Sequence, residues 1–102
     1  MSKKLILKKG APGTNGCDPD IKYLKLKKKA ELEIKNQSGS KQKLWCITDG
    51  LLSPMKGNSI TILDKGSWKG TVGSTKGTYL YNYDDSPEED ALGPRKGTID
   101  PS

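Results

Sequence analysis

Carboxylates gather near the end of the chain, in the segment Asp84–Asp90, and their chemistry is that of ligands for a hard cation. The segment has five Asp and Glu residues in seven positions, around Pro87. Oxygen ligands of this kind suit Ca²⁺ or Mg²⁺, but the spacing is not that of an EF-hand loop. The alternative is a solvated acidic loop that pairs with lysines of the same molecule. The sequence leaves both interpretations of residues 84–90 open.

Sulfur and imidazole chemistry is limited to two cysteines, Cys17 and Cys46, because the sequence has no histidine. A structural zinc site needs four nitrogen or sulfur ligands, so the composition excludes one. Nucleophiles of the Ser–His or Cys–His type need an imidazole base and are excluded for the same reason. We therefore expect that the protein is not an enzyme. We also expect that it has no catalytic residue, no metal site and no cofactor. Cys17 and Cys46 form either one disulfide in an exported protein or two buried thiols in a cytosolic one.

Lysines are concentrated in the first half of the chain. Residues 1–49 hold twelve lysines against five acidic residues, a net charge of +7, whereas residues 50–102 have a net charge of −1. Lysines on the solvated face of a half-exposed sheet are the simpler interpretation. The alternative is a surface for nucleic acid or another anionic polymer, with Tyr23 or Trp68 available for stacking. The candidate residues for that surface are Lys22, Lys25, Lys27, Lys28, Lys29 and Lys35.

Alternation of apolar and charged residues predicts that β-strands carry these groups. Leu24 and Leu26 alternate with lysines, and Leu32 and Ile34 alternate with Glu and Lys, which indicates two strands joined at residues 28–29. Further extended segments are expected at residues 4–8, 44–47, 59–63, 66–73, 77–83 and 95–99. About seven or eight short strands at turn spacings of roughly ten residues are typical of an antiparallel β-sandwich.

The connections between the expected strands and the length of the chain indicate how the domain is organised. Residues 49–58 form a long connection with room for a short helical turn near residues 50–56. A chain of 102 residues fits a single domain, residues 1–102. No segment approaches the ~20 apolar residues of a membrane span, and Leu5–Leu7 is too short for a signal-peptide core. The compartment is periplasmic or extracellular if a signal peptide has been removed, and cytoplasmic otherwise.

The order of four segments between Pro19 and Ile99 gives information about the fold. They are a strand, turn, strand and asparagine over residues 19–36, the strand Lys43–Ile47, the strand Gly77–Tyr83 and the closing segment Arg95–Ile99. In this order they resemble the cupredoxin family, the small Greek-key β-sandwiches that include azurin and plastocyanin. The resemblance implies an all-β fold made of a single antiparallel Greek-key sandwich.

The same resemblance assigns positions to the copper ligands of that family. The first histidine falls at Gln42 or Lys43, the cysteine at Tyr83, the second histidine at Ala91 and the methionine at Arg95. A type 1 copper site needs two histidines and a cysteine, so every ligand is replaced. We expect Tyr83 to fill the former metal pole, with its phenol bonded to a neighbour such as Lys43.

The resemblance and the replaced ligands together give a functional hypothesis. We expect a non-enzymatic, copper-free cupredoxin-like module that binds an unidentified macromolecule, such as a protein, or builds part of an assembly. A basic protein that binds nucleic acid or an anionic polymer is the alternative. An electron-transfer protein with an atypical copper site is the third candidate.

Overall fold

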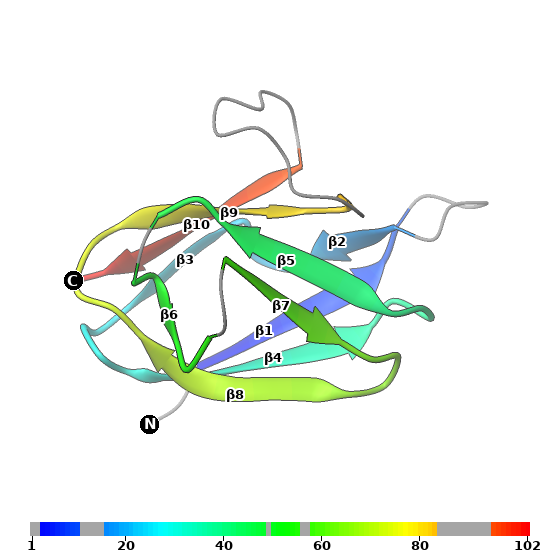
Figure 1. The fold of residues 1–102 in the computed structure, drawn as a ribbon, viewed down its shortest axis with the longest axis horizontal. Coiled ribbons are helices and arrows are strands. Elements are labelled where there is room, and N and C mark those ends of the chain that lie inside the picture. The colour runs from blue at the N-terminus through cyan, green and yellow to red at the C-terminus, as the bar shows by residue number, and fades with distance from the viewer. Residues whose placement is uncertain (1–2, 11–15, 49, 56–57, 84–94) are drawn as a thin grey trace.

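The chain folds into ten β-strands in a computed structural model that describes residues 3–10, 16–48, 50–55, 58–83 and 95–102 (Figure 1). The strands are β1 (Lys3–Lys9), β2 (Cys17–Pro19), β3 (Tyr23–Leu26), β4 (Glu31–Gln37), β5 (Gln42–Cys46), β6 (Leu52–Ser53), β7 (Ser59–Ile62), β8 (Ser67–Val72), β9 (Gly77–Tyr81) and β10 (Lys96–Pro101). Acidic residues 84–90 and Ala91 lie outside the described residues.

The strands form two five-stranded sheets that pack against each other as a sandwich (Figure 1). One sheet has the order β2-β1-β4-β8-β6, and the other has the order β3-β10-β9-β5-β7. The pairs β1–β4 and β3–β10 are parallel, and the other pairs are antiparallel. Both sheets are therefore mixed, because the chain crosses from one sheet to the other and brings strands together that are not consecutive.

The predicted β-sandwich is confirmed, with more strands than the seven or eight expected. The additional elements include β2 and β6, which have three and two residues. Segments this short show no readable alternation of polar and apolar residues, so the sequence pattern could not reveal them.

The segment expected to have room for a helical turn is extended instead. In residues 50–55, β6 pairs with β8, with Leu52 opposite Val72, and the N–H of Gly73 donates to the carbonyl of Leu51. Pairing with β8 satisfies backbone groups that a helical turn would have bonded locally. The described residues include no helix, and hence none that is long and apolar enough to cross a membrane.

The core lies between the inner faces of the two sheets and follows the predicted alternation. Leu24, Leu26, Leu32 and Ile34 are buried, whereas Lys25 is exposed to solvent. Successive side chains of a strand point to opposite faces of its sheet, so each strand contributes one buried row and one solvated row.

Trp68 lies on β8 and packs against this core, partly buried, so it is not the exposed stacking group considered from the sequence. Its indole covers Gly70 on the same strand, where an added Cβ would lie 2.5 Å from the ring and 2.3 Å from the carbonyl oxygen of Ser53. Close approach of both groups therefore requires glycine at position 70.

A buried amide at the end of β4 holds two turns together. The side chain of Asn36 is 0% exposed, and its Nδ2 donates to the carbonyls of Ser40 at 2.8 Å and Ile62 at 2.9 Å. Its Oδ1 accepts from the N–H of Ser38 at 3.0 Å and from the Ser38 hydroxyl at 2.6 Å. Buried polar groups stabilise a fold when they are paired in this way, and they destabilise it when a partner is lost.

Replacing this amide should be strongly destabilising. We expect Asn36→Ala to lower the free energy of unfolding by about 3 kcal/mol, because several buried donors and acceptors lose their partner at once. The measurement is equilibrium unfolding in urea. Gln37→Ala, on the next and exposed position of β4, is the matched control and should change the free energy by less than about 0.5 kcal/mol. Equal effects of the two substitutions would contradict the role given to Asn36.

Candidate functional site

The end of the sandwich that the resemblance assigns to copper is formed by the start of β5 and the end of β9. Leu44 pairs with Tyr81 in the antiparallel register, so the start of β5 lies beside the residues that follow β9. Gln42 is the first residue of β5 and is 5% exposed. Its Nε2 donates to the hydroxyls of Ser38 and Ser40, both at 3.0 Å. The amide of Gln42 is thus part of the polar network centred on Asn36.

Lys43 lies on the opposite, outer face of β5, together with Trp45. The Nζ of Lys43 is 4.6 Å from the centroid of the Trp45 ring, within the range of a cation–π contact. The indole Nε1 of Trp45 donates to the carbonyl of Tyr83 at 3.0 Å. The expected bond between Lys43 and the Tyr83 phenol is therefore replaced by contacts of each residue with Trp45.

Arg95 also meets Tyr83. The guanidinium carbon of Arg95 is 5.2 Å from the centroid of the Tyr83 ring, and its NH1 donates to the carbonyl of Asn82 at 3.2 Å. Of the assigned ligand positions, Lys43 and Tyr83 thus contact Trp45, and Arg95 contacts Tyr83. Tyr83 itself is half-buried, and its ring lies against the Arg95 guanidinium.

A left-handed residue, Asn82, lies between Tyr81 and Tyr83. Asn82 has φ of +64°, which ends the regular alternation of β9 after the buried Tyr79 and Tyr81. Its Oδ1 accepts from the N–H of Cys17 at 2.7 Å, and its Nδ2 donates to the carbonyl of Cys17 at 2.9 Å. Asn82 therefore connects β2 of one sheet to the end of β9 in the other. The sequence analysis missed this link, for which the asparagine that follows the tyrosine strand was the available signal.

Tyr79 fills the interior behind this end of the sandwich. Its side chain is 1% exposed, and its ring covers Gly97 of β10, where an added Cβ would lie 2.3 Å from the ring. Burial raises the pKa of Tyr79, and the nearby Tyr81, Cys17, Asp20 and Cys46 raise it further. No described residue accepts or donates a hydrogen bond at the Tyr79 hydroxyl. The phenol is therefore neutral and acts as a packing group.

The two cysteines are free and buried in the described part of the chain. Of the two alternatives left open by the sequence, the structure has two thiols and no Cys17–Cys46 disulfide. Burial raises the pKa of Cys17 to about 12, with a smaller contribution from Asp18, and it raises the pKa of Cys46 to about 12. Both groups are protonated thiols at neutral pH, which makes them poor nucleophiles and poor metal ligands.

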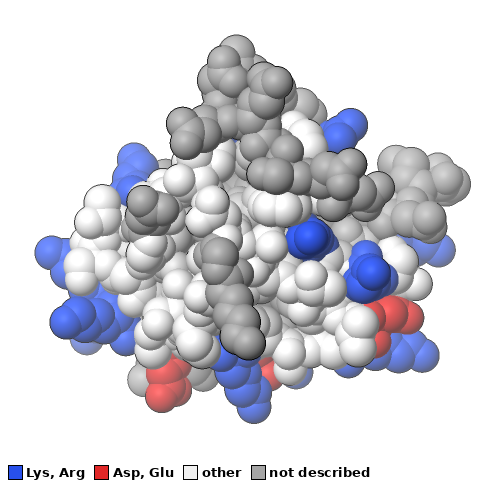
Figure 2. Space-filling model, in the orientation of Figure 1, with Lys and Arg blue, Asp and Glu red and all other residues white. Residues whose placement is uncertain are grey.

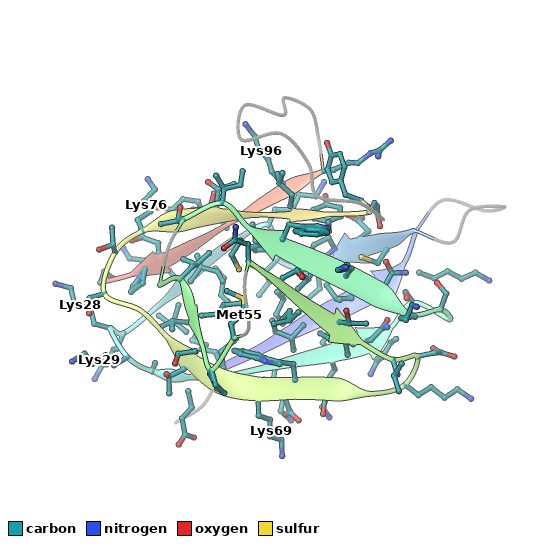
Figure 3. All side chains as sticks on the ribbon, viewed as in Figure 1. Lys28, Lys29, Met55, Lys69, Lys76 and Lys96 are labelled. Carbon is teal, nitrogen blue, oxygen red and sulfur yellow. The ribbon has the colours of Figure 1, made fainter. Side chains whose placement is uncertain are left out.

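The six lysines proposed as an anionic-partner surface do not lie on one face. Lys28 and Lys29 lie at one end of the sandwich, at the turn between β3 and β4 (Figure 3). Lys25 is on the edge strand β3 of one sheet, whereas Lys35 is on the central strand β4 of the other. Lys22 lies 3.7 Å from a carboxylate oxygen of Asp18. Figure 2 likewise shows Lys and Arg side chains at several places around the molecule.

The fold is cupredoxin-like. A purple cupredoxin from Nitrosopumilus maritimus is similar over 98% of this chain and 99% of its own, with a TM-score of 0.61 and 13% identity. An amicyanin mutant in its reduced Cu(I) form is similar over 97% and 82%, with a TM-score of 0.61 and 9% identity. A blue copper oxidase from Nitrosomonas europaea is similar over 97% of this chain but 43% of its own, with a TM-score of 0.52 and 14% identity.

These similarities concern the fold alone, because all three identities are low. No family model matches the sequence, and no curated protein matches it.

The residues at the assigned positions do not fit the type 1 copper of such proteins. The amide of Gln42 is occupied by Ser38 and Ser40, and Lys43 and Arg95 bear positive charges. Type 1 copper binds imidazole nitrogens and a thiolate, and the whole sequence has no histidine. Within the described ranges, no group of three or more Asp, Glu, Cys or His residues could hold a metal ion.

The buried thiols predict how stability responds to alkaline pH. Their folded pKa of about 12 lies above the value of 9.0 for an exposed cysteine, so the unfolded chain loses these protons first as the pH rises. The free energy of unfolding should be unaffected by the thiols below pH 9.0 and fall between there and about 12, by about 1.4 kcal/mol per pH unit for each thiol.

Urea unfolding at a series of pH values measures this effect. Cys46→Ala should show a shallower fall than the unsubstituted protein, because one of the two thiol contributions is removed. Identical slopes would contradict the burial of a protonated Cys46.

Proposed function

We propose that the chain is a non-enzymatic cupredoxin-like module that works without type 1 copper, as a binding or structural domain. The replaced ligand positions carry this proposal. Gln42, Lys43, Tyr83 and Arg95 are each engaged with neighbouring protein groups through hydrogen bonds or ring contacts. A scaffold that keeps the sandwich but uses these positions for its own packing is suited to presenting a surface.

The chemistry of the side chains supports a non-enzymatic role. General acid–base and nucleophilic catalysis depend on groups whose pKa is close to the working pH or is lowered by a partner. Here both cysteines and Tyr79 have raised pKa values, which keeps them protonated. The carboxylates of Glu33 and Asp100 lie on outer faces of the sheets, where they contact Lys69 and Tyr23.

Addition of Cu²⁺ tests the proposal. We expect no intense thiolate-to-copper charge-transfer band in the visible spectrum, because the two thiols are buried and protonated and no imidazole is present. Amicyanin, which shares the fold, is the positive control under the same conditions. A strong visible band with one copper per chain would overturn the proposal.

A further inference from the structure

The outer faces of the two sheets differ in how their charges are balanced. On the sheet β2-β1-β4-β8-β6, Glu33 lies between Lys4 and Lys69 in the registers of the paired strands. The Nζ of Lys69 is 3.9 Å from a carboxylate oxygen of Glu33, and Lys8 lies opposite Asp18. Positive and negative side chains therefore alternate across this face, as expected of an ordinary solvated surface.

The outer face of the sheet β3-β10-β9-β5-β7 and its rim have a different composition, and we call this surface the aromatic face. Among the described residues it has one carboxylate, that of Asp100. Its cations are Lys25, Lys43, Lys76, Arg95 and Lys96. In Figure 3, Lys76 and Lys96 project on the side of β9 and β10, and Lys69 projects on the opposite side of the sandwich.

Three of these cations lie over aromatic rings rather than beside carboxylates. Lys43 lies over Trp45 and Arg95 over Tyr83, as described above, and the Nζ of Lys76 is 5.5 Å from the centroid of the Tyr23 ring. A cation held by a ring keeps its positive charge available to an anion. Among the described residues, the face therefore combines ring surfaces with more cations than carboxylates.

Two of the rings are fixed in place by hydrogen bonds at their polar ends. The Tyr23 hydroxyl donates to a carboxylate oxygen of Asp100, and the Trp45 indole donates to the carbonyl of Tyr83. Tyr23 nevertheless remains 51% exposed. A ring that is already oriented loses little conformational entropy when a flat group stacks on it.

The floor between the two rings is formed by paired strands. Tyr23 lies opposite Thr98, and Thr98 lies opposite Thr78, so small side chains separate Tyr23 from the middle of the sheet. Trp45 lies opposite Leu80 on β9. Three strand spacings separate β3 from β5, or about 14 Å. Leu80 is 1% exposed, so a single strand that crosses from one ring to the other would pass over the side chains that cover Leu80 and not over bare sheet.

We propose that the aromatic face binds single-stranded nucleic acid, with bases stacked on Tyr23 and Trp45 and phosphates neutralised by Lys43, Lys76, Arg95 and Lys96. Stacking on aromatic side chains beside a positive groove is how proteins bind single strands without sequence preference. A duplex hides the faces of its bases, so it offers only phosphates to this surface. An acidic polypeptide offers carboxylates but few flat rings, so it would use the cations and leave Tyr23 and Trp45 without a role.

This inference rests on the proposed function, because it names a partner for the proposed binding module. Its failure would leave the copper-free module in place, since the copper titration is read independently of any nucleic acid.

The test is a titration of fluorescein-labelled oligothymidine with the whole protein, followed by fluorescence anisotropy at low and at increasing salt. The substitutions Lys43→Ala, Lys76→Ala and Lys96→Ala are combined in one variant. The matched control combines Lys4→Ala, Lys8→Ala and Lys69→Ala, which removes the same charge from the other sheet. Tyr23→Leu tests stacking, and a duplex of equal length and polyglutamate are added as competitors.

We expect the aromatic-face variant to bind at least tenfold more weakly. The slope of the logarithm of the binding constant against the logarithm of the salt concentration should become shallower by about 2, because three phosphate contacts are lost and each contributes about 0.7 on a single strand. The control variant should bind within threefold of the unsubstituted protein. Tyr23→Leu should weaken binding about fivefold or more, the loss of one stacked base. Urea unfolding of each variant confirms that it is folded.

Three results would overturn the proposal. The first is that oligothymidine does not bind at low salt. The second is that the two triple variants lose the same amount of affinity for oligothymidine. The third is that polyglutamate competes with oligothymidine while Tyr23→Leu binds oligothymidine as tightly as the unsubstituted protein. The last result would instead identify the face as a surface for acidic proteins.

Discussion

The side-chain amide of Asn36 is the interaction on which this end of the sandwich depends. It lies at the end of β4 and reaches the carbonyls of Ser40 and Ile62, while its own backbone bonds to residues 65 and 66. One buried group thus fixes the turn before β5 and the turn after β7. Because each partner is also buried or part-buried, loss of the amide would leave several polar groups unpaired at once.

The Asn36 network also includes the position that the resemblance assigns to the first copper ligand. Gln42 is directed into it through Ser38 and Ser40, so the position assigned to the first histidine now serves the scaffold. Asn82 joins the two sheets nearby through the backbone of Cys17, and Tyr79 packs on Gly97. We propose that hydrogen bonds and packing of this kind hold the sandwich together with no contribution from a metal.

The sequence predicted the sandwich because alternation is a local signal. Leu24, Leu26, Leu32 and Ile34 each indicate which face of a strand is buried, and the order of segments in the sequence resembles that of the cupredoxin fold. Residues whose role depends on distant partners could not be predicted. Asn36 was expected only to precede a turn, and Asn82 was expected only to continue the strand at residues 77–83. Their partners, Ile62 and Cys17, lie 26 and 65 positions away in the sequence, so a local pattern does not reveal these bonds.

The candidate site was predicted less well for the same reason. Of the replaced ligand positions, Tyr83 and Arg95 contact each other, and Ala91 lies outside the described residues. Tyr83 was expected to fill the metal pole, and it is half-buried beside Asn82, which has a left-handed conformation. The lysines singled out by their density in sequence lie on different sheets. The aromatic face is assembled from β3, β5, the loop before β9, and the residues around β10, which are far apart in the chain.

The central claim, that protein contacts alone hold the sandwich together, is tested most directly by thermal unfolding with a strong chelator and with excess Cu²⁺. A metal that binds the folded state raises the melting temperature in proportion to its affinity and concentration. Our account predicts the same melting temperature in both conditions. A melting temperature that falls with the chelator or rises with copper, in step with one bound ion per chain, would contradict it.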